Sequence, residues 1–315
     1  MKICVNLWQK NFFQEAFEMK RKIKTRNGFT LVELLTTLAV IGVLLGLLIP
    51  ALNQVGKTAA KVKQKAQFHA IGTALETFRN DWGDYPPSAW DGNADLVPDY
   101  GRYCASQRLA EALIGRDGLG FHPASEFREG GLAVINGADT PIYDAINGIP
   151  GYQTAAENLA ARKGPYLELE SANAVKLNQL SLSIIGPLNK NTYVLIDMYK
   201  QVKNTATGKD VGLPILYYKA NKLRIGNSPA VADWDKINTY SINDSFCNSW
   251  GIITSTGDWS DPVANASVFY NAIQNPNFPG PPARPYRAES FLLQSAGPDG
   301  LYGTTDDMFN FDQDN

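Results

Sequence analysis

The chain has 315 residues, and its 29 basic residues nearly balance its 31 acidic residues, giving a formal net charge of −2. This length allows one large domain or two small ones. Basic residues are dense only in residues 1–28 and around residues 57–65, so the composition argues against nucleic acid as the main partner.

A basic segment leads directly into a long apolar run at the N-terminus. Residues 20–28 read KRKIKTRNG, and the apolar run from Phe29 to Leu52 contains one carboxylate, Glu33. A run of this length can cross a bilayer as a single helix. A carboxylate inside such a run is costly and by default marks a function.

Three interpretations compete for residues 1–52. A secretory signal peptide has a shorter apolar core and a small-residue cleavage site, which this stretch lacks. A plain membrane anchor requires neither Glu33 nor the Gly28-Phe29 junction. The stretch GFTLVELL, residues 28–35, resembles the prepilin signal shared by type IV pilins and the pseudopilins of type II secretion.

This resemblance implies how the chain is processed and where it lies. A prepilin peptidase would cut between Gly28 and Phe29 on the cytoplasmic side and then N-methylate Phe29. The leader, residues 1–28, would stay in the cytoplasm, as its basic charge favours. Residues 29–52 would cross the inner membrane once, and residues 53–315 would form a pilin-like head in the periplasm. The mature chain would carry 22 basic against 29 acidic residues.

The same resemblance implies assembly roles for two residues. In a filament, Glu33 would neutralise the buried terminal amine of a neighbouring Phe29; the alternative is that Glu33 merely snorkels to the interface. Pro50 would mark where the helix bends or melts, or else it simply ends the membrane span. The implied partners are further copies and other pseudopilins in the filament, the prepilin peptidase and the inner-membrane assembly platform.

Beyond Pro50 the sequence predicts a continuing helix to about Asp81, with residues 53–81 as its amphipathic half. Apolar residues recur there at steps of three and four, and most basic residues fall on the other side. Gly83 and the pair Pro86-Pro87 form a strong stop signal. The predicted apolar stripe comprises Leu52, Val55, Ala59, Val62, Ala66, Ala70, Ile71, Ala74, Leu75 and Phe78.

The rest of the chain predicts an α+β fold, in which the long helix packs on a small antiparallel sheet. Residues 88–190 are rich in Gly, Pro, Asn and Asp and resemble an irregular insertion, with short helices at 107–114 and 153–163. Residues 191–315 contain three strand patterns, at 191–199, 213–220 and 290–296, bounded by turn residues. Packing such a sheet on the helix buries the apolar face of each.

An acidic, glycine-rich loop follows the last predicted strand. Asp299, Asp306 and Asp307 lie within residues 295–308, and carboxylate and carbonyl oxygens are the ligands that Ca²⁺ prefers. The stretch resembles the calcium loop that closes the head of the major pseudopilin, the G subunit of type II secretion. The resemblance implies a structural calcium held by these three residues; the alternative is a solvated acidic turn.

Cysteine and histidine usage adds two predictions. Cys4 would leave with the leader, and Cys104 and Cys247 would pair as a disulfide or remain buried thiols in the oxidising periplasm. The two histidines, His69 and His122, have no metal-ligand spacing, and no nucleophile or nucleotide motif is present, so we expect no enzyme.

These observations predict a structural subunit of a type II secretion pseudopilus, cleaved, methylated and assembled helix against helix to support protein export. The alternatives are a type IV pilus subunit, a pilin-anchored periplasmic ligand-binding protein with its site in residues 88–190, and a membrane-anchored hydrolase.

Overall fold

The chain divides into two compact units, residues 1–56 and residues 57–315. The computed structural model describes residues 28–88, 103–143, 151, 154–182, 189, 191–224, 226–228, 238–244 and 262–311. The leader before Gly28, with Cys4, lies outside these residues, as do Cys247 and parts of the predicted insertion.

One helix, α2 (Leu31–Trp82), covers 52 residues and runs without interruption through Pro50. Its bounds agree within two residues with the predicted helix from Phe29 to Asp81. It ends at Gly83, whose φ of 86° lies in the left-handed region that glycine adopts at no steric cost. The Gly83 N–H donates to the carbonyl of Arg79 at 2.7 Å and closes the last turn.

The buried side of α2 in the head differs from the predicted stripe. Six residues of the predicted apolar stripe are exposed, Val55 at 64% and Val62 at 61% among them, so the prediction that they share the buried face is wrong. These six are Leu52, Val55, Ala59, Val62, Ala66 and Ala70. The buried stripe starts instead at two glutamines, because the backbone of the head offers them hydrogen-bond partners. The buried residues of this stripe are Gln64, Gln67, Phe68, Ile71, Ala74, Leu75 and Phe78.

The central sheet has three antiparallel strands in the order β7 (Leu216–Lys219), β8 (Phe291–Ser295) and β9 (Met308–Phe309). Its register pairs Tyr217 with Leu293. The predicted strands at 213–220 and 290–296 are confirmed by β7 and β8, whereas β9 was not predicted because it is only two residues long.

Alternate residues of this sheet enter two different apolar clusters. Tyr217 and Leu293 face one cluster, which includes the buried stripe of α2. Tyr218 and Leu292 face the other, which includes Phe269 of α6 (Pro262–Ala272). Because both faces are buried, the strands are apolar nearly throughout instead of alternating with polar residues.

The predicted strand at 191–199 forms β4 (Tyr193–Leu195), but it belongs to a separate antiparallel pair with β3 (Ala174–Lys176). A single bridge, from Ile196 to Pro214, links this pair to the segment that enters β7. A further pair joins β5 (Val202–Lys203) to β6 (Asp210–Val211). The α+β class is confirmed, and the residues that the structure describes form four small antiparallel sheets in place of one.

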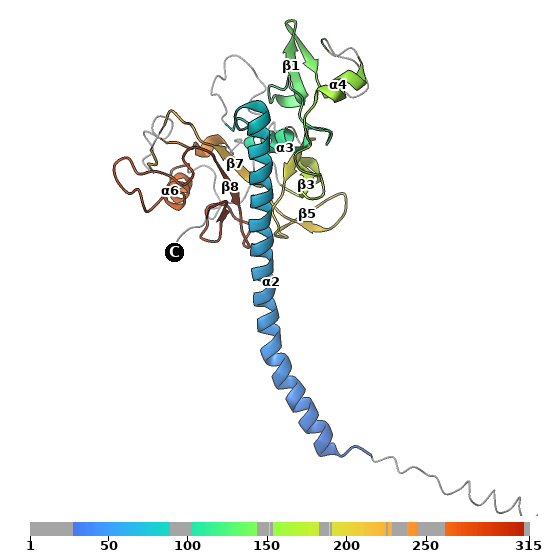
Figure 1. The fold of residues 1–315 in the computed structure, drawn as a ribbon. Coiled ribbons are helices and arrows are strands. Elements are labelled where there is room, and N and C mark those ends of the chain that lie inside the picture. The colour runs from blue at the N-terminus through green and yellow to red at the C-terminus, as the bar shows by residue number, and fades with distance from the viewer. Residues whose placement is uncertain are drawn as a thin grey trace, which may run out of the picture. The chain divides into compact units, whose positions relative to one another are not determined.

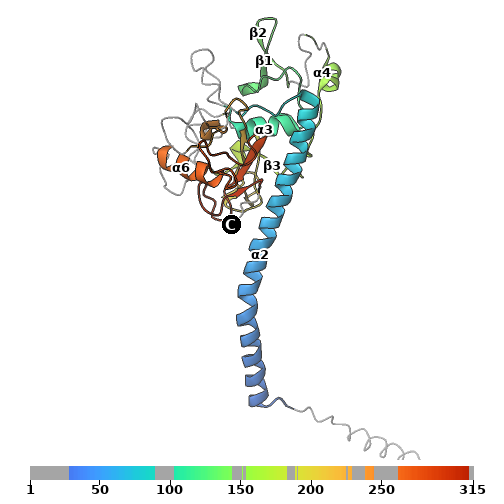
Figure 2. The same ribbon diagram turned by 60° about the vertical axis from the view of Figure 1, so that its left-hand side comes forward.

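The region predicted as an insertion contributes both core and periphery. The predicted helix at 107–114 is confirmed as α3 (Ala105–Ile114), and every one of its residues is buried. The predicted helix at 153–163 is confirmed as α4 (Ala155–Ala161). A hairpin of β1 (Leu132–Ile135) and β2 (Ala138–Pro141) projects from the rest of the head in both views (Figures 1 and 2).

Candidate functional site

The predicted processing junction precedes the first turn of α2. Phe29 is 83% exposed, and Thr30 caps the helix that starts at Leu31. The N–H and the hydroxyl of Thr30 each donate to Glu33 Oε2 at 2.9 Å, and the Glu33 N–H donates to Thr30 Oγ1 at 3.2 Å. This reciprocal pattern is a capping box, so Glu33 has a local structural role besides the predicted one in assembly.

The helix that follows is apolar around its whole circumference. Residues Leu31–Ile49 have a mean hydropathy of 2.5, and none of this window is buried inside the structure. The window is long enough to cross a membrane and ends immediately before Pro50. An exposed helix that is apolar on all sides requires a bilayer or other helices around it.

The acidic loop is closed by its own backbone. Asp306 Oδ2 accepts the N–H of Asp299 at 3.0 Å, and Asp299 Oδ1 accepts the N–H of Leu301 at 2.8 Å. Asp307 Oδ2 accepts the N–H of Gly303 and the amide of Gln294, both at 2.7 Å. The three predicted carboxylates therefore lie in one loop, each engaged with N–H donors.

Asp307 is the buried member of the three. Its Oδ1 atom is buried and has no hydrogen-bond partner among the described residues. Burial raises the pKa of Asp307 to about 7, against the opposing effect of the hydrogen bonds from Gly303 and Gln294. The neighbouring carboxylates of Asp306 and Asp299 raise it further by repulsion.

The fit of this loop to calcium is incomplete. The unpartnered Asp307 Oδ1 suits a cation, because calcium prefers carboxylate oxygens and a buried carboxylate needs a partner. However, the described residues contain no group of three acidic, histidine or cysteine side chains that could together hold a metal ion.

A glycine permits the loop to close on the strand before it. Gly297 has a φ of 67°, and a Cβ there would lie 2.2 Å from the carbonyl oxygen of Asp306. The carbonyl of Gly297 accepts the side-chain amide of Gln201 at 2.7 Å. Only a residue without a side chain allows the two ends of the loop to approach this closely.

Sequence analysis missed a buried carboxylate that joins the strands beneath this loop. Asp197 is 1% exposed, and its Oδ1 atom accepts the N–H groups of Tyr199 and Leu213, both at 3.1 Å. Its Oδ2 atom accepts the hydroxyl of Ser295 at 2.8 Å. Burial raises the pKa of Asp197 to about 7, and these three hydrogen bonds oppose that increase.

Two buried glutamines of α2 were missed as well. Gln67 Nε2 donates to the carbonyl of Ile196 at 2.8 Å and to that of Ala172 at 3.4 Å. Gln64 Oε1 accepts the N–H of Met198 at 2.8 Å. The two amides thus attach α2 to the segment on either side of Asp197. An apolar side chain at position 64 would leave the N–H of Met198 without this acceptor, whereas the carbonyl of Ile196 has a second donor, the side-chain amide of Asn173, at 2.9 Å.

The remaining predicted site residues have these positions. Cys104 is buried at the N-cap of α3, and because Cys247 lies outside the described residues, the disulfide stays a prediction. His69 is exposed on α2. His122 is buried, which lowers its pKa to about 4. Pro50 lies inside α2, and its role in assembly stays a prediction.

Comparison with known proteins gives one match. The model of the prokaryotic N-terminal methylation motif matches residues 23–49, which contain the predicted cut and Glu33. No curated protein and no solved structure matches the chain significantly. The match supports a type IV pilin-like prepilin, which a prepilin peptidase processes and which assembles with other pilins. Together with the apolar helix, the match fits a chain that is anchored in the membrane with its head outside the cytoplasm. It also favours a structural subunit over an enzyme.

Proposed function

We propose that the chain is a structural subunit of a type II secretion pseudopilus, cut between Gly28 and Phe29 and assembled helix against helix to support protein export. The observation that carries this proposal is a methylation motif on a helix whose apolar surface is exposed on every side. The glycine-rich acidic loop at the end of the head, which resembles that of the major pseudopilin, favours the secretion branch over the pilus branch.

Assembly gives Glu33 a second partner. Cleavage before Phe29 creates a terminal amine four residues from Glu33, and packing of apolar helices would bury both charges. A neighbour's carboxylate then compensates each amine, because a charge removed from water is tolerated only when it is paired. The capping box does not prevent this, since a carboxylate has acceptor sites beyond those that Thr30 occupies.

The capping role and the assembly role can be separated with two variants. Glu33→Gln retains the capping box, because glutamine serves at this position, but it removes the charge. Glu33→Ala removes both. We expect both variants to lose recovery in sheared, sedimentable filaments while remaining in the membrane. The matched control is Thr30→Ala, which removes the side chain of the helix cap and keeps the charge. If Glu33→Gln assembled as the unmodified chain does, the charge-pairing role would be wrong.

The kind of filament is tested by loss of the chain from its host. A pseudopilus subunit is required for release of exported proteins into the medium, whereas a type IV pilus subunit is required for surface pili. We expect export to fail and pili to persist. The reverse result would favour the pilus, and no effect on either would favour a pilin-anchored periplasmic ligand-binding protein.

We further propose that the acidic loop binds a structural calcium ion, with Asp307 as the buried ligand and Asp299 and Asp306 beside it. The unpartnered Asp307 Oδ1 supports this assignment, and a cation would relieve the repulsion among three carboxylates in one loop. Calcium should raise the melting temperature of the full chain relative to chelator, and Asp307→Asn should abolish that difference. Asp210→Asn, an exposed change outside the loop, is the control. Equal melting in calcium and chelator would refute the metal site.

A further inference from the structure

A glutamine from outside the acidic loop reaches into it. Gln201 lies directly before β5, and its Nε2 atom donates to the carbonyl of Gly297 at 2.7 Å. Because a carbonyl only accepts hydrogen bonds, this contact fixes the orientation of the amide and directs Oε1 away from Gly297. Gln201 Oε1 is buried and has no hydrogen-bond partner among the described residues. A buried carbonyl oxygen without a partner is costly, so this atom requires one.

Two glycines allow the loop to close around the Gln201 side chain. A Cβ at Gly300 would lie 2.6 Å from Cγ and 3.1 Å from Cβ of Gln201. A Cβ at Gly297 would lie 2.2 Å from the carbonyl oxygen of Asp306 and 3.1 Å from Asp306 Oδ2. The segment 297–300 therefore contacts both Gln201 and Asp306 so closely that its two glycines have no room for side chains.

The loop contains more buried acceptors than donors. Asp307 is only 9% exposed; its Oδ2 atom already accepts two N–H groups, and its Oδ1 atom has no partner. Gln201 Oε1 and an ionised Asp307 Oδ1 are both acceptors, so neither satisfies the other. The unpartnered atoms on α2 differ, because Gln67 Oε1 is an acceptor and Gln64 Nε2, one turn away, is a donor. The two oxygens in the loop require a cation or a water molecule.

An amide oxygen also answers the shortage of ligands in this loop. Calcium takes about six to eight oxygens, and the carbonyls of Asn and Gln are among those it accepts. The described residues contain no group of three acidic, histidine or cysteine side chains that could together hold a metal ion. A site here must therefore draw on carbonyl oxygens. Gln201 supplies one without adding a further negative charge.

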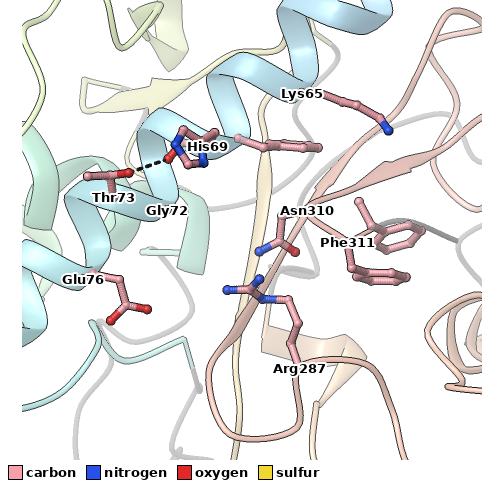
Figure 3. Close-up of a pocket in the computed structure, with 10 residues that line it drawn as sticks. Lys65, His69, Gly72, Thr73, Glu76, Arg287, Asn310 and Phe311 are labelled. Carbon is pink, nitrogen blue, oxygen red and sulfur yellow. Dashed lines mark hydrogen bonds between the residues drawn. The ribbon is translucent and has the colours of Figure 1, made fainter. Parts of the chain in front are cut away.

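A hollow farther along α2 offers no comparable oxygens. Figure 3 shows Lys65 and Arg287 beside this hollow, and Glu76 is the one carboxylate among the described residues that line it. Glu76 Oε1 already accepts the hydroxyl of Tyr85 at 2.6 Å. Its surroundings have charges of both signs, so this hollow does not suit a metal ion.

Three lysines of α2 lie on the outer side of the acidic loop. Lys57, Lys61 and Lys65 line one hollow together with Asp306 and Asp307. These ammonium groups lower the negative potential of the loop from outside. Asp307 Oδ1 is buried, however, and accepts no hydrogen bond from any described residue. The lysines therefore leave the inner oxygens of the loop available.

We propose that Gln201 Oε1 is a ligand of the calcium ion that the acidic loop binds, beside the buried oxygen of Asp307. The inference rests on the proposed calcium site and adds a ligand from outside the loop. The Gln201 amide would then act through both of its ends, with Nε2 holding the Gly297 carbonyl and Oε1 holding the ion. Calcium would thus join the segment before β5 to the loop that follows β8.

Three variants separate a ligand from a hydrogen-bond donor. Gln201→Leu removes both the oxygen and the donor, whereas Gln201→Glu keeps oxygen ligands and removes the donor. Gln67→Leu is the matched control, because it removes a buried amide that donates to a backbone carbonyl outside the loop. Calcium binding is measured by calorimetric titration of the full chain in detergent, after treatment with chelator. We expect Gln201→Leu to weaken binding by at least about tenfold, and Gln201→Glu and Gln67→Leu to bind at least as tightly as the parent.

Terbium supplies a readout that does not depend on affinity. It occupies calcium sites, and its luminescence lifetimes in H₂O and D₂O count the water molecules bound to the ion. We expect the ion in Gln201→Leu to hold about one more water molecule than in the parent, because water replaces the missing protein oxygen. The count should be unchanged in Gln201→Glu and in Gln67→Leu.

The outcomes distinguish this inference from the calcium site on which it rests. If Gln201→Leu bound calcium as the parent does, with the same water count, the inference would be wrong and the calcium site would stand. If Gln201→Glu folded but lost calcium, the role of Gln201 would be its hydrogen bond to Gly297, and the inference would again be wrong. A parent chain that binds no calcium would remove both, and the lysines of α2 would be the cations that compensate the loop.

Discussion

Replacing Asp197 tests whether one buried carboxyl group joins the separate sheets of the head. Its oxygens accept hydrogen bonds from Tyr199, Leu213 and Ser295, which lie four residues after β4, before β7 and at the end of β8. Asp197→Ala would leave two backbone N–H groups and one hydroxyl without this partner. At about 1–3 kcal/mol for each of these three buried unsatisfied donors, the loss is roughly 3–9 kcal/mol.

Asp197→Asn separates the hydrogen bonds from the charge. The amide oxygen can accept both backbone N–H groups, and its NH₂ can donate to the hydroxyl oxygen of Ser295, so the shape of the site is kept. Because the pKa of Asp197 is raised from 3.8 to about 7, the folded chain holds a proton that the unfolded chain loses between pH 4 and pH 7. The stabilisation that the protonated Asp197 carboxyl contributes is therefore fully present below about pH 4, and it is lost as the pH rises through 7.

The difference between the parent chain and Asp197→Asn isolates this effect. Urea unfolding of the full chain in detergent, followed through the buried tyrosines, gives the free energy of unfolding at each pH. Between pH 4 and pH 7 we expect the free energy of unfolding of the parent to fall by on the order of 4 kcal/mol relative to that of Asp197→Asn. This is the free energy that corresponds to raising the pKa of Asp197 from 3.8 to about 7. A constant difference over this range would refute the assigned protonation, and an Asp197→Ala variant as stable as the parent would refute the structural role.

Two further changes probe the attachment of α2 and the closure of the acidic loop. Gln67→Ala removes the amide that donates to the carbonyls of Ile196 and Ala172, of which Ile196 keeps a second donor in Asn173, and it opens a small cavity. We expect the free energy of unfolding in urea to fall by about 1–3 kcal/mol; an unchanged midpoint would contradict the role given to this amide. Gly297→Ala forces a Cβ to within 2.2 Å of the Asp306 carbonyl at a φ of 67°. We expect it to lower the melting temperature and reduce any calcium-dependent increase, and a variant that keeps both would show that the loop is not closed as described.

Much of the fold could be predicted because its signals are local. The helix α2 follows from an apolar run, a three- and four-residue periodicity and the stop at Gly83, and β7 and β8 follow from short apolar stretches between turns. The position of the buried stripe could not be read in the same way. Val62 fits the periodicity and is exposed, whereas Gln64 and Gln67 look like surface residues and are buried.

The polar residues that organise the head depend on distant partners. The hydrogen-bond partners of Asp197 are 2, 16 and 98 residues away, and those of Gln67 are 105 and 129 residues away. No local pattern marks an amide or a carboxyl group for such a role. The only sequence signal for Asp197 is its position directly after a strand of apolar residues. The prepilin junction was recognisable because its motif is contiguous.

The most direct test of the proposed function is the intact mass and N-terminal sequence of the chain isolated from native membranes. A chain that starts at N-methylated Phe29 would establish cleavage after Gly28 and the prepilin pathway, as the proposal predicts. A chain that starts at Met1, or that is cut beyond Leu52, would contradict prepilin processing and with it the assembly role of Glu33.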